Sequence, residues 1–250
     1  GLGDVYKRQT MNDMKKIWIV SLLLLGCFAA RAQAPAPLKG RIAVSVPRVD
    51  MRLSYAEYDK AFSGDLRTAQ TDLEGRYMLP DDDKIYAVTL HRRDDAAGAP
   101  ALASFFILPG EQLEVLGLFQ DGDTFDWRVK GSPVFEADYE YGRKYRREEL
   151  RAATLRRQNL AGEWDDLSPE RQRQLNAELR LLDRGIKERR CAYIRENPSS
   201  PLSAYYFTCQ PFPIEEVVEY YSMLSESLRE GRYAPILNFV CEMYQRILNA

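Results

Sequence analysis

The chain has 250 residues, of which 45% are hydrophobic and 29% charged, and this composition excludes collagen-like and disordered proteins. Its 35 Lys and Arg residues nearly balance 37 Asp and Glu residues, so the net charge of −2 gives no general attraction to nucleic acid or to an anionic membrane. One histidine, His91, and four cysteines leave too few ligands for a structural zinc site of the usual spacing.

Residues 14–32 have the three parts of a secretory signal peptide. Met14-Lys15-Lys16 forms a basic start, residues 17–25 are apolar, and Ala30-Arg31-Ala32 offers a small-residue cleavage site. The apolar run has only about half of the roughly 20 residues that a membrane-spanning helix needs. We therefore expect export to the periplasm or cell envelope, a spacer over 33–37 after cleavage, and an extraneous leader over 1–13, in front of the basic start.

A different processing site is suggested by Leu24-Leu25-Gly26-Cys27, which resembles the lipobox of bacterial lipoproteins. Acylation of Cys27 would anchor the mature chain to a membrane. The bulky Leu25 and the apolar residues that follow Cys27 argue against this alternative, which stays open.

Residues 38–131 are predicted to form an antiparallel β-sandwich, because short runs of β-branched and aromatic residues alternate there with turn clusters. Along the first run, Ile42, Val44 and Val46 share one face, and the alternate residues, Arg41 among them, are expected at the solvent or at a rim. About eight strands are expected, over residues 38–46, 51–58, 66–72, 77–79, 85–91, 102–108, 112–119 and 125–130.

Residues 132–250 are predicted to form a helical subdomain of four or five helices, so the fold class is α+β. Ser168-Pro169-Glu170 has the composition of a helix start, and we expect a helix from there to about residue 197. A preceding helix over about 136–160 would pair with it in antiparallel fashion, using Leu155 and Leu160. Further helices are expected to begin at Ser200-Pro201, at Pro213 and at about Ala234.

None of the candidate reactive residues assembles into a catalytic motif. Cys191, Cys209 and Cys241 include no Cys-Xaa-Xaa-Cys pair and are predicted to be mostly buried apolar residues, although one disulfide among them stays open. His91 would act as a general base only beside a nucleophile, and a surface histidine is the favoured interpretation.

Three other patterns have a structural interpretation that we favour. The basic stretch 143–157 contains interleaved glutamates, which indicate a solvated helix face and not a nucleic-acid site. Asp81-Asp82-Asp83 and Asp121-Gly122-Asp123 suit turns better than a calcium loop. The aromatic clusters 205–207 and 220–221 are expected to pack in the core. No catalytic, cofactor-binding or metal-ligating residue is therefore assigned, and no cofactor is expected.

The order of several short motifs resembles a known family. These motifs are Leu38-Lys39-Gly40 at the first strand, the turn Asp72-Leu73-Glu74-Gly75-Arg76-Tyr77, the turn 106–111 (Phe-Ile-Leu-Pro-Gly-Glu), and Val129-Lys130-Gly131-Ser132. Together with Glu196-Asn197-Pro198-Ser199-Ser200, they resemble the domain of uncharacterised function that precedes the thioredoxin domain in secreted TlpA/ResA-like thiol-disulfide oxidoreductases. The resemblance covers about 38–250.

The resemblance implies that this chain is a non-catalytic accessory domain serving redox homeostasis in the envelope. Its partner would be a C-terminal thioredoxin domain carrying Trp-Cys-Xaa-Xaa-Cys, a motif that this sequence lacks. We expect the sequence to be a fragment that stops at Ala250, before that domain. Positioning the thioredoxin domain, dimerisation and client recognition are alternative roles. A stand-alone envelope module that binds glycan or peptide is the rival function, and a carboxylate-based hydrolase, which needs two acids in one cleft, is a third.

Overall fold

The computed structural model describes residues 36–61, 65–96, 98–120, 124–209 and 211–248. The expected leader, signal peptide and Cys27 lie outside the described residues, as do Asp121-Gly122-Asp123, most of the 33–37 spacer and Ala250. In the described part of the chain, no helix is long and apolar enough to cross a membrane.

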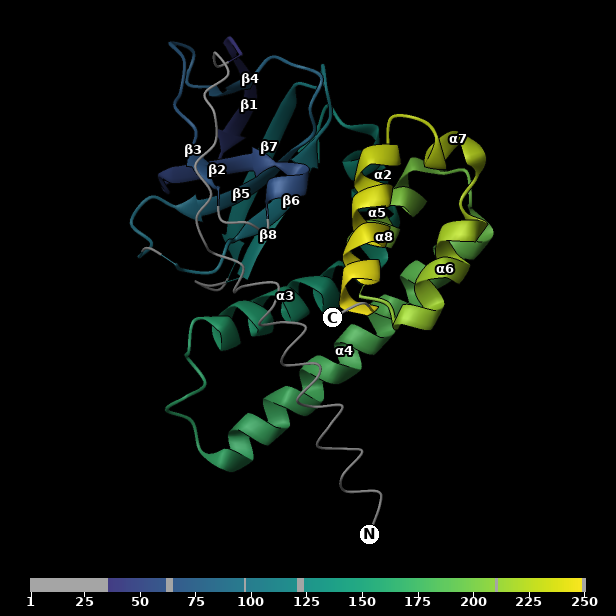
Figure 1. Ribbon diagram of the computed structural model, residues 1–250. Helices are drawn as coiled ribbons and strands as arrows, with labels where there is room; N and C mark the ends of the chain where they lie inside the picture. The colour runs from purple at the N-terminus through teal and green to yellow at the C-terminus, as the bar shows by residue number, and fades with distance from the viewer. Residues whose placement is uncertain (1–35, 62–64, 97, 121–123, 210, 249–250) are drawn as a thin grey trace.

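Within these ranges, eight strands form two four-stranded sheets that pack face to face in a sandwich-like arrangement (Figure 1). One sheet has the order β4-β1-β7-β8 and the other the order β3-β2-β5-β6. The strands are β1 (Leu38–Ser45), β2 (Met51–Glu57), β3 (Arg67–Thr68), β4 (Tyr77–Pro80), β5 (Tyr86–Arg92), β6 (Ala103–Ile107), β7 (Leu113–Gln120) and β8 (Thr124–Lys130).

The expectation of a purely antiparallel sandwich is wrong for one strand pair. β1 and β7 run parallel, with Ile42 opposite Leu113 and Val44 opposite Val115. Between β1 and β7, the chain forms the strands of the second sheet, and this long segment is the crossover connection that a parallel pair needs. The first sheet is therefore mixed and the second antiparallel.

The strand expected over 66–72 is reduced to the two residues of β3. Ala69 still donates from its amide to the Leu53 carbonyl oxygen in the second sheet, at 2.9 Å. One residue later, the Gln70 carbonyl oxygen accepts from the Met78 amide of β4 at 2.7 Å, so the chain here leaves one sheet for the other. This crossing links the β3 and β4 edges of the sandwich.

The helical part contains more helices than the expected four or five. Gly142 interrupts the single helix expected over 136–160, because glycine is costly inside a helix, and a short 3-10 turn, η2 (Arg143–Tyr145), follows it. The α-helices are α2 (Pro133–Gly142), α3 (Arg146–Leu160), α4 (Pro169–Glu196), α5 (Pro201–Cys209), α6 (Ile214–Met223), α7 (Glu226–Arg229) and α8 (Ala234–Leu248).

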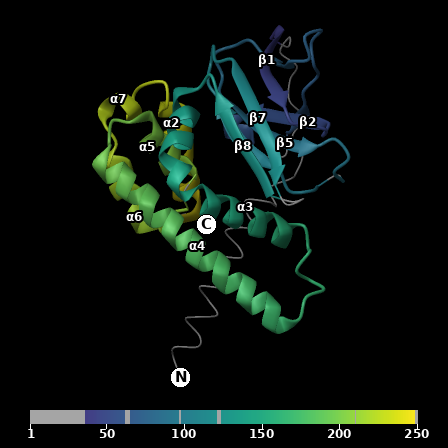
Figure 2. The ribbon, with the colours of Figure 1, turned by 180° about the vertical axis from the view of Figure 1, so that it is seen from behind.

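Helices α3 and α4 form the expected antiparallel pair, which extends away from the sandwich (Figures 1 and 2). Ser168 caps α4 by accepting a hydrogen bond from the Arg171 amide at 3.3 Å. Leu155, Trp164 and Leu175 form a small core between the two helices, whereas Leu160 is 51% exposed and does not join it. Trp164, in the turn between the helices, therefore takes the place that was expected for Leu160.

The helices cover the side of the sandwich where β6 and β8 are the edge strands. α2 and α3 contact β8, and Phe135 of α2 has its ring centre 5.3 Å from that of Phe106 in β6 and 5.2 Å from that of Tyr205 in α5. One continuous hydrophobic cluster therefore includes side chains of both the sheets and the helices. Covering these edges also prevents their pairing with other chains.

Arg41 is the largest departure from the predicted strand pattern, because it is 1% exposed where a solvent or rim position was expected. The pairing of β1 with β4 shifts register between Gly40 and Ile42, and this bulge allows Arg41 and Ile42 both to be buried. The Arg41 guanidinium donates three hydrogen bonds to backbone carbonyl oxygens: from Nε to Glu111 at 3.2 Å, from Nη1 to Pro80 at 3.2 Å and from Nη2 to Leu108 at 2.5 Å.

The carboxylate of Glu111 lies beside this guanidinium and extends the network to the helices. It accepts from the Leu108 amide at 2.9 Å and from the Ser132 hydroxyl at 3.2 Å, and Arg232 Nη2 lies 3.6 Å from it. Ser132 precedes α2, and Arg232 lies between α7 and α8. The network therefore reaches both ends of the helical part.

Replacing Arg41 by Met should strongly lower the free energy of unfolding. The change leaves three buried carbonyl oxygens without their donor, so we expect a loss of about 3 kcal/mol or more in the free energy of unfolding, measured with urea. Lys39→Met in the same strand is the matched control, because Lys39 is exposed, and should stay within about 0.5 kcal/mol of the wild type. Equal midpoints for the two variants would contradict this role for Arg41.

Candidate interaction surface

The three described cysteines lie on three different helices, and none is in a disulfide. Cys191 is buried in α4, as predicted, whereas Cys241 in α8 is half-buried and Cys209 at the end of α5 is exposed. Burial raises the pKa of the Cys241 thiol. The expectation of burial is therefore wrong for Cys209.

His91 lies at the end of β5, opposite Arg52 of β2. Partial burial lowers the pKa of His91, and the neighbouring Arg52 charge adds to this effect. Both causes favour the neutral imidazole.

The basic stretch 143–157, which lies in η2 and α3, has several of its arginines paired with carboxylates of neighbouring elements. Arg146 contacts Asp126 of β8 at 2.6 Å, and Arg151 contacts Glu178 of α4 at 2.7 Å. Arg156 forms another ion pair with Asp183. Arg143, Lys144 and Arg147 are exposed, which agrees with the predicted solvated helix face, whereas Arg146 and Arg156 are partly buried in their ion pairs. These ion pairs also hold α3 against β8 and α4.

Tyr206, Phe207 and Tyr220 of the aromatic clusters lie in the interior, as expected, whereas Tyr205 and Tyr221 are only partly buried and pack against it. Tyr206 is 1% exposed, Phe207 is fully buried and Tyr220 is 5% exposed. The Tyr206 hydroxyl donates to Asp138 of α2 at 2.9 Å, and Arg190 of α4 has its guanidinium 5.2 Å from the Tyr206 ring centre. These contacts tie α2, α4 and α5 together.

Burial raises the pKa of Asp138, while the Arg190 charge opposes the shift. Burial also raises the pKa of Glu149 in α3, and the nearby charge of Asp138 adds to this shift. A carboxylate-based hydrolase needs one acid with a raised pKa and a second that stays ionised, whereas burial raises the pKa of both Asp138 and Glu149. In addition, neither carboxylate lines the hollow over β7 and β8 or the groove between α6 and α8, so their geometry gives the hydrolase hypothesis no support.

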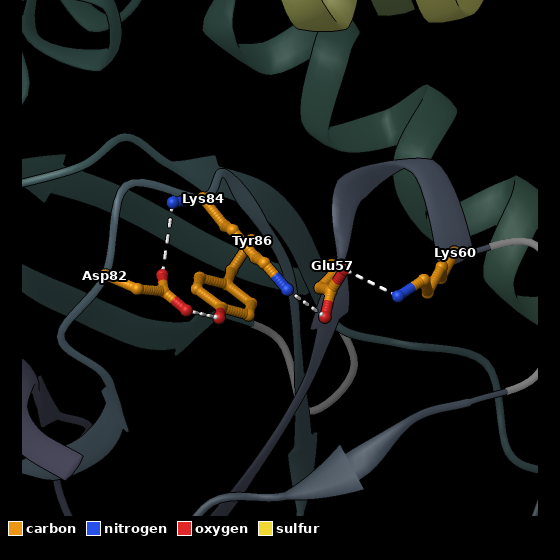
Figure 3. A network of polar contacts seen from close by, with 5 residues as sticks. All are labelled: Glu57, Lys60, Asp82, Lys84 and Tyr86. Carbon is orange, nitrogen blue, oxygen red and sulfur yellow. Dashed lines mark hydrogen bonds and ion pairs between the residues drawn. The ribbon is translucent and has the colours of Figure 1, made fainter. Parts of the chain in front are cut away.

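Asp82 has the turn role that the sequence predicts. One of its carboxylate oxygens accepts from the Lys84 amide at 3.1 Å and the other from the Tyr86 hydroxyl at 2.7 Å (Figure 3). In the described ranges, no group of three or more His, Cys, Asp or Glu side chains is placed to hold a metal ion. The second aspartate cluster, at 121–123, is outside those ranges.

Glu57, at the end of β2, has two lysine partners (Figure 3). Its carboxylate lies 2.7 Å from Lys60 Nζ and 2.8 Å from Lys84 Nζ. Burial alone would raise the pKa of Glu57, but the hydrogen bonds from Lys60 and Lys84 outweigh it and hold the pKa below its usual value. This arrangement fixes the short 3-10 helix η1 (Tyr58–Lys60) against β5.

Tyr58, held in η1, connects the sandwich to α8. Its ring centre lies 5.7 Å from that of Phe239 in α8 and 6.3 Å from that of Phe106 in β6, both with edge-to-face geometry. Burial raises the pKa of Tyr58 to about 12. The polar network of Figure 3 therefore supports the contact that positions α8.

The larger surface hollow is an apolar groove between α6 and α8, with a volume of about 430 Å³. Tyr221, near the end of α6, donates a hydrogen bond to Asn238, near the start of α8, at 3.0 Å, so the helices run antiparallel along it. Val218 is 74% exposed and Leu248 62% exposed, while Val217 is buried at 3% exposure. The residues that line the groove are Ile214, Val217, Val218, Tyr221, Asn238, Cys241, Glu242, Tyr244, Gln245 and Leu248.

The smaller hollow has a volume of about 210 Å³ and lies over β7 and β8 beside α2. Trp127 and Tyr139 supply aromatic surface, and Asp126 and Arg128 supply polar groups. The Arg128 guanidinium lies 5.6 Å from the Tyr139 ring centre. An aromatic ring beside a carboxylate and a guanidinium is a combination that can hold a polar, ring-shaped ligand.

Comparisons of the chain with protein-family models, curated proteins and solved structures found no match.

Glu57→Gln should lower stability near neutral pH and have little effect in acid. The folded pKa of Glu57 is depressed, so its stabilising contribution is present above the unfolded pKa and disappears as pH falls through the folded one. We expect a loss of about 0.5–1 kcal/mol at pH 7 from urea unfolding, because the network is only partly buried. Glu74→Gln, at an exposed turn, is the control, and a Glu57→Gln deficit that grows toward low pH would contradict the assignment.

Proposed function

We propose that this chain is a non-catalytic accessory domain of an exported thioredoxin-like thiol-disulfide oxidoreductase, and that it binds a protein partner. The observation that carries the proposal is the groove between α6 and α8, which leaves Val218 and Leu248 exposed on a surface otherwise rich in paired charges. Exposed apolar surface of this kind is typical of protein-interaction sites.

The residues behind the family resemblance have structural roles, which is compatible with an accessory domain. A side chain on Gly40 would put its Cβ 1.9 Å from an Asp72 carboxylate oxygen, and one on Gly131 would put its Cβ 2.1 Å from the Gln112 carbonyl oxygen. Asp72 accepts hydrogen bonds from the amides of Glu74 and Arg76, as a turn requires. The motifs thus describe turns and close backbone contacts, and no reaction chemistry comes with them.

The proposed location is the periplasm or cell envelope. It rests on the signal-peptide pattern of residues 14–32, and attachment to a membrane through acylated Cys27 is the alternative form. In an oxidising compartment, the exposed Cys209 and the half-buried Cys241 would be open to pairing with a partner's cysteine, whereas Cys191 is buried.

Sequencing the gene beyond the codon for Ala250 tests the proposal directly. We expect the reading frame to continue into a thioredoxin-like domain with Trp-Cys-Xaa-Xaa-Cys. In an assay with dithiothreitol as reductant, the present chain, purified from the periplasm, should not speed up the reduction of insulin disulfides above the rate with dithiothreitol alone. It has no adjacent pair of thiols to act as a dithiol. A stop codon shortly after Ala250, or insulin reduction that is lost in a Cys191→Ser/Cys209→Ser/Cys241→Ser variant, would overturn it.

A stand-alone module for glycan or peptide is the second candidate function, and the hollow beside Tyr139 favours it. Stacking on Tyr139 and hydrogen bonds to Asp126 and Arg128 would recognise a sugar ring.

Glycan binding predicts that Tyr139→Ala weakens binding to an array of envelope polysaccharides by at least about tenfold, the effect of losing one stacking contact. Tyr145→Ala serves as the control, because Tyr145 does not line that hollow. Equal binding by both variants, or no binding by the wild type, would exclude this hollow as a glycan site.

A further inference from the structure

We propose that the hollow over β7 and β8 binds a single sugar ring that carries a carboxylate, a uronic acid residue, through the guanidinium of Arg128. This inference rests on the second candidate function, glycan binding, and deepens it by naming the class of sugar.

The floor of the hollow is a patch of four side chains on one face of the first sheet. In the antiparallel pairing of β7 with β8, Leu116 lies opposite Arg128 and Leu118 lies opposite Asp126. Residues directly opposite each other in such a pair share a face of the sheet, and all four line the hollow. Leu118 is 54% exposed. Apolar and charged side chains therefore lie side by side on an open surface.

Tyr139 forms the wall of the hollow. It belongs to α2, which packs against β8 (Figure 2). Its ring centre lies 5.6 Å from the guanidinium carbon of Arg128 and 5.8 Å from that of Arg146. The ring of Tyr139 and the exposed side chain of Leu118 give the hollow two apolar surfaces, and the C–H face of a sugar ring can pack on surfaces of this kind.

The carboxylate of Asp126 is already engaged. Its Oδ1 accepts from Arg146 Nε at 2.8 Å and from Arg146 Nη2 at 2.6 Å, and its Oδ2 accepts from Gln120 Nε2 at 3.0 Å. Arg146 therefore offsets the negative charge of Asp126. The pair also joins the start of α3 to β8, which keeps the border of the hollow in place.

Arg128, in contrast, has donors to spare. Its side chain is exposed, and among the described residues it forms no ion pair and donates no hydrogen bond, so its printed contact is the one with the Tyr139 ring. The next residue on the same face of β8, Lys130, is paired with Glu114 at 3.4 Å. The charge of the hollow that no neighbour offsets is thus positive. A guanidinium offers a planar fork of N–H groups that fits the two oxygens of a carboxylate.

The size of the hollow limits the ligand to one ring. Its volume of about 210 Å³ is below the roughly 300–1,000 Å³ of pockets for larger ligands. A uronic acid residue combines an apolar ring face for Tyr139 and Leu118 with a carboxylate for Arg128. A neutral hexose provides only the first of these contacts, and a small anion provides only the second.

The test compares three probes: methyl glucuronide, methyl glucoside, which has CH₂OH in place of the carboxylate, and sodium acetate. Each is titrated into the ¹⁵N-labelled chain, and the backbone amide signals of residues 116–118 and 126–128 are followed by NMR. We expect methyl glucuronide to bind about fivefold more tightly than either other probe, because an exposed charge-assisted pair adds a modest gain. This advantage should shrink between about 0.05 M and 0.3 M salt.

Arg128→Gln separates charge recognition from ring packing. We expect it to reduce the preference for glucuronide over glucoside to less than about twofold and to leave the affinity for the glucoside unchanged. Arg143→Gln is the matched control, because Arg143 is also an exposed arginine but does not line the hollow, and it should keep the full preference. Tyr139→Ala should weaken the binding of both sugars by the same factor, since both use the ring.

Three results would overturn the inference: equal affinity for glucuronide and glucoside, a preference for glucuronide that survives Arg128→Gln, or acetate binding as tight as glucuronide binding. These results differ from failure of the glycan function. Equal binding of both sugars that is lost in Tyr139→Ala leaves glycan binding intact and removes only the selectivity for acidic sugars. If neither sugar shifts the amide signals of β7 and β8, both the glycan function of this hollow and the inference fail.

Discussion

The buried guanidinium of Arg41 connects parts of the chain that are far apart in sequence. Its three carbonyl acceptors come from the end of β4, the residue after β6 and a residue shortly before β7, so one side chain joins both sheets at one end of the sandwich. Burial lowers the pKa of Arg41, and the nearby carboxylates of Asp81 and Glu111 oppose this. A buried charge is tolerated only when its hydrogen bonds are satisfied, and here the backbone itself satisfies them.

Glu111 transmits this constraint to the helices. Its carboxylate touches Ser132, where α2 begins, and Arg232, which precedes α8. Tyr58, which follows β2, provides a second connection to α8 through Phe239. α8 is therefore fixed at two places by the sandwich, and α6, which packs on α8, takes its position from it. The groove is a product of the whole fold, although only two helices line it.

The fold class and the order of elements were predictable from the sequence, because periodicity and turn chemistry are local signals; Ser168-Pro169-Glu170, for example, marked the start of α4. Errors arose where distant contacts decide the outcome. Arg41 was placed at the solvent because a bulge cannot be read from alternation. The groove was not predicted, because the sequence does not show that α6 covers only part of the apolar surface of α8. The residues of α8 divide between a buried face, with Ile236, Leu237 and Val240, and an open face, with Cys241 and Leu248. An apolar stripe wider than one neighbouring helix can cover is the sequence signal that points to a second contact surface.

The distribution of charge explains why the interaction chemistry is concentrated at one end of the helical part. Elsewhere, basic residues are engaged in the ion pairs of α3 with α4 and β8, and the buried acid Asp138 is held by Tyr206 and Arg190. These groups maintain the packing of helices, so a ligand that recruited them would weaken the fold. Glu215 and Glu219 of α6 are exposed without an ion pair among the described residues, and Glu242 of α8 lines the groove next to its apolar residues. The apolar surface that the described part of the chain leaves uncovered there can contact a partner at little cost to the stability of the protein.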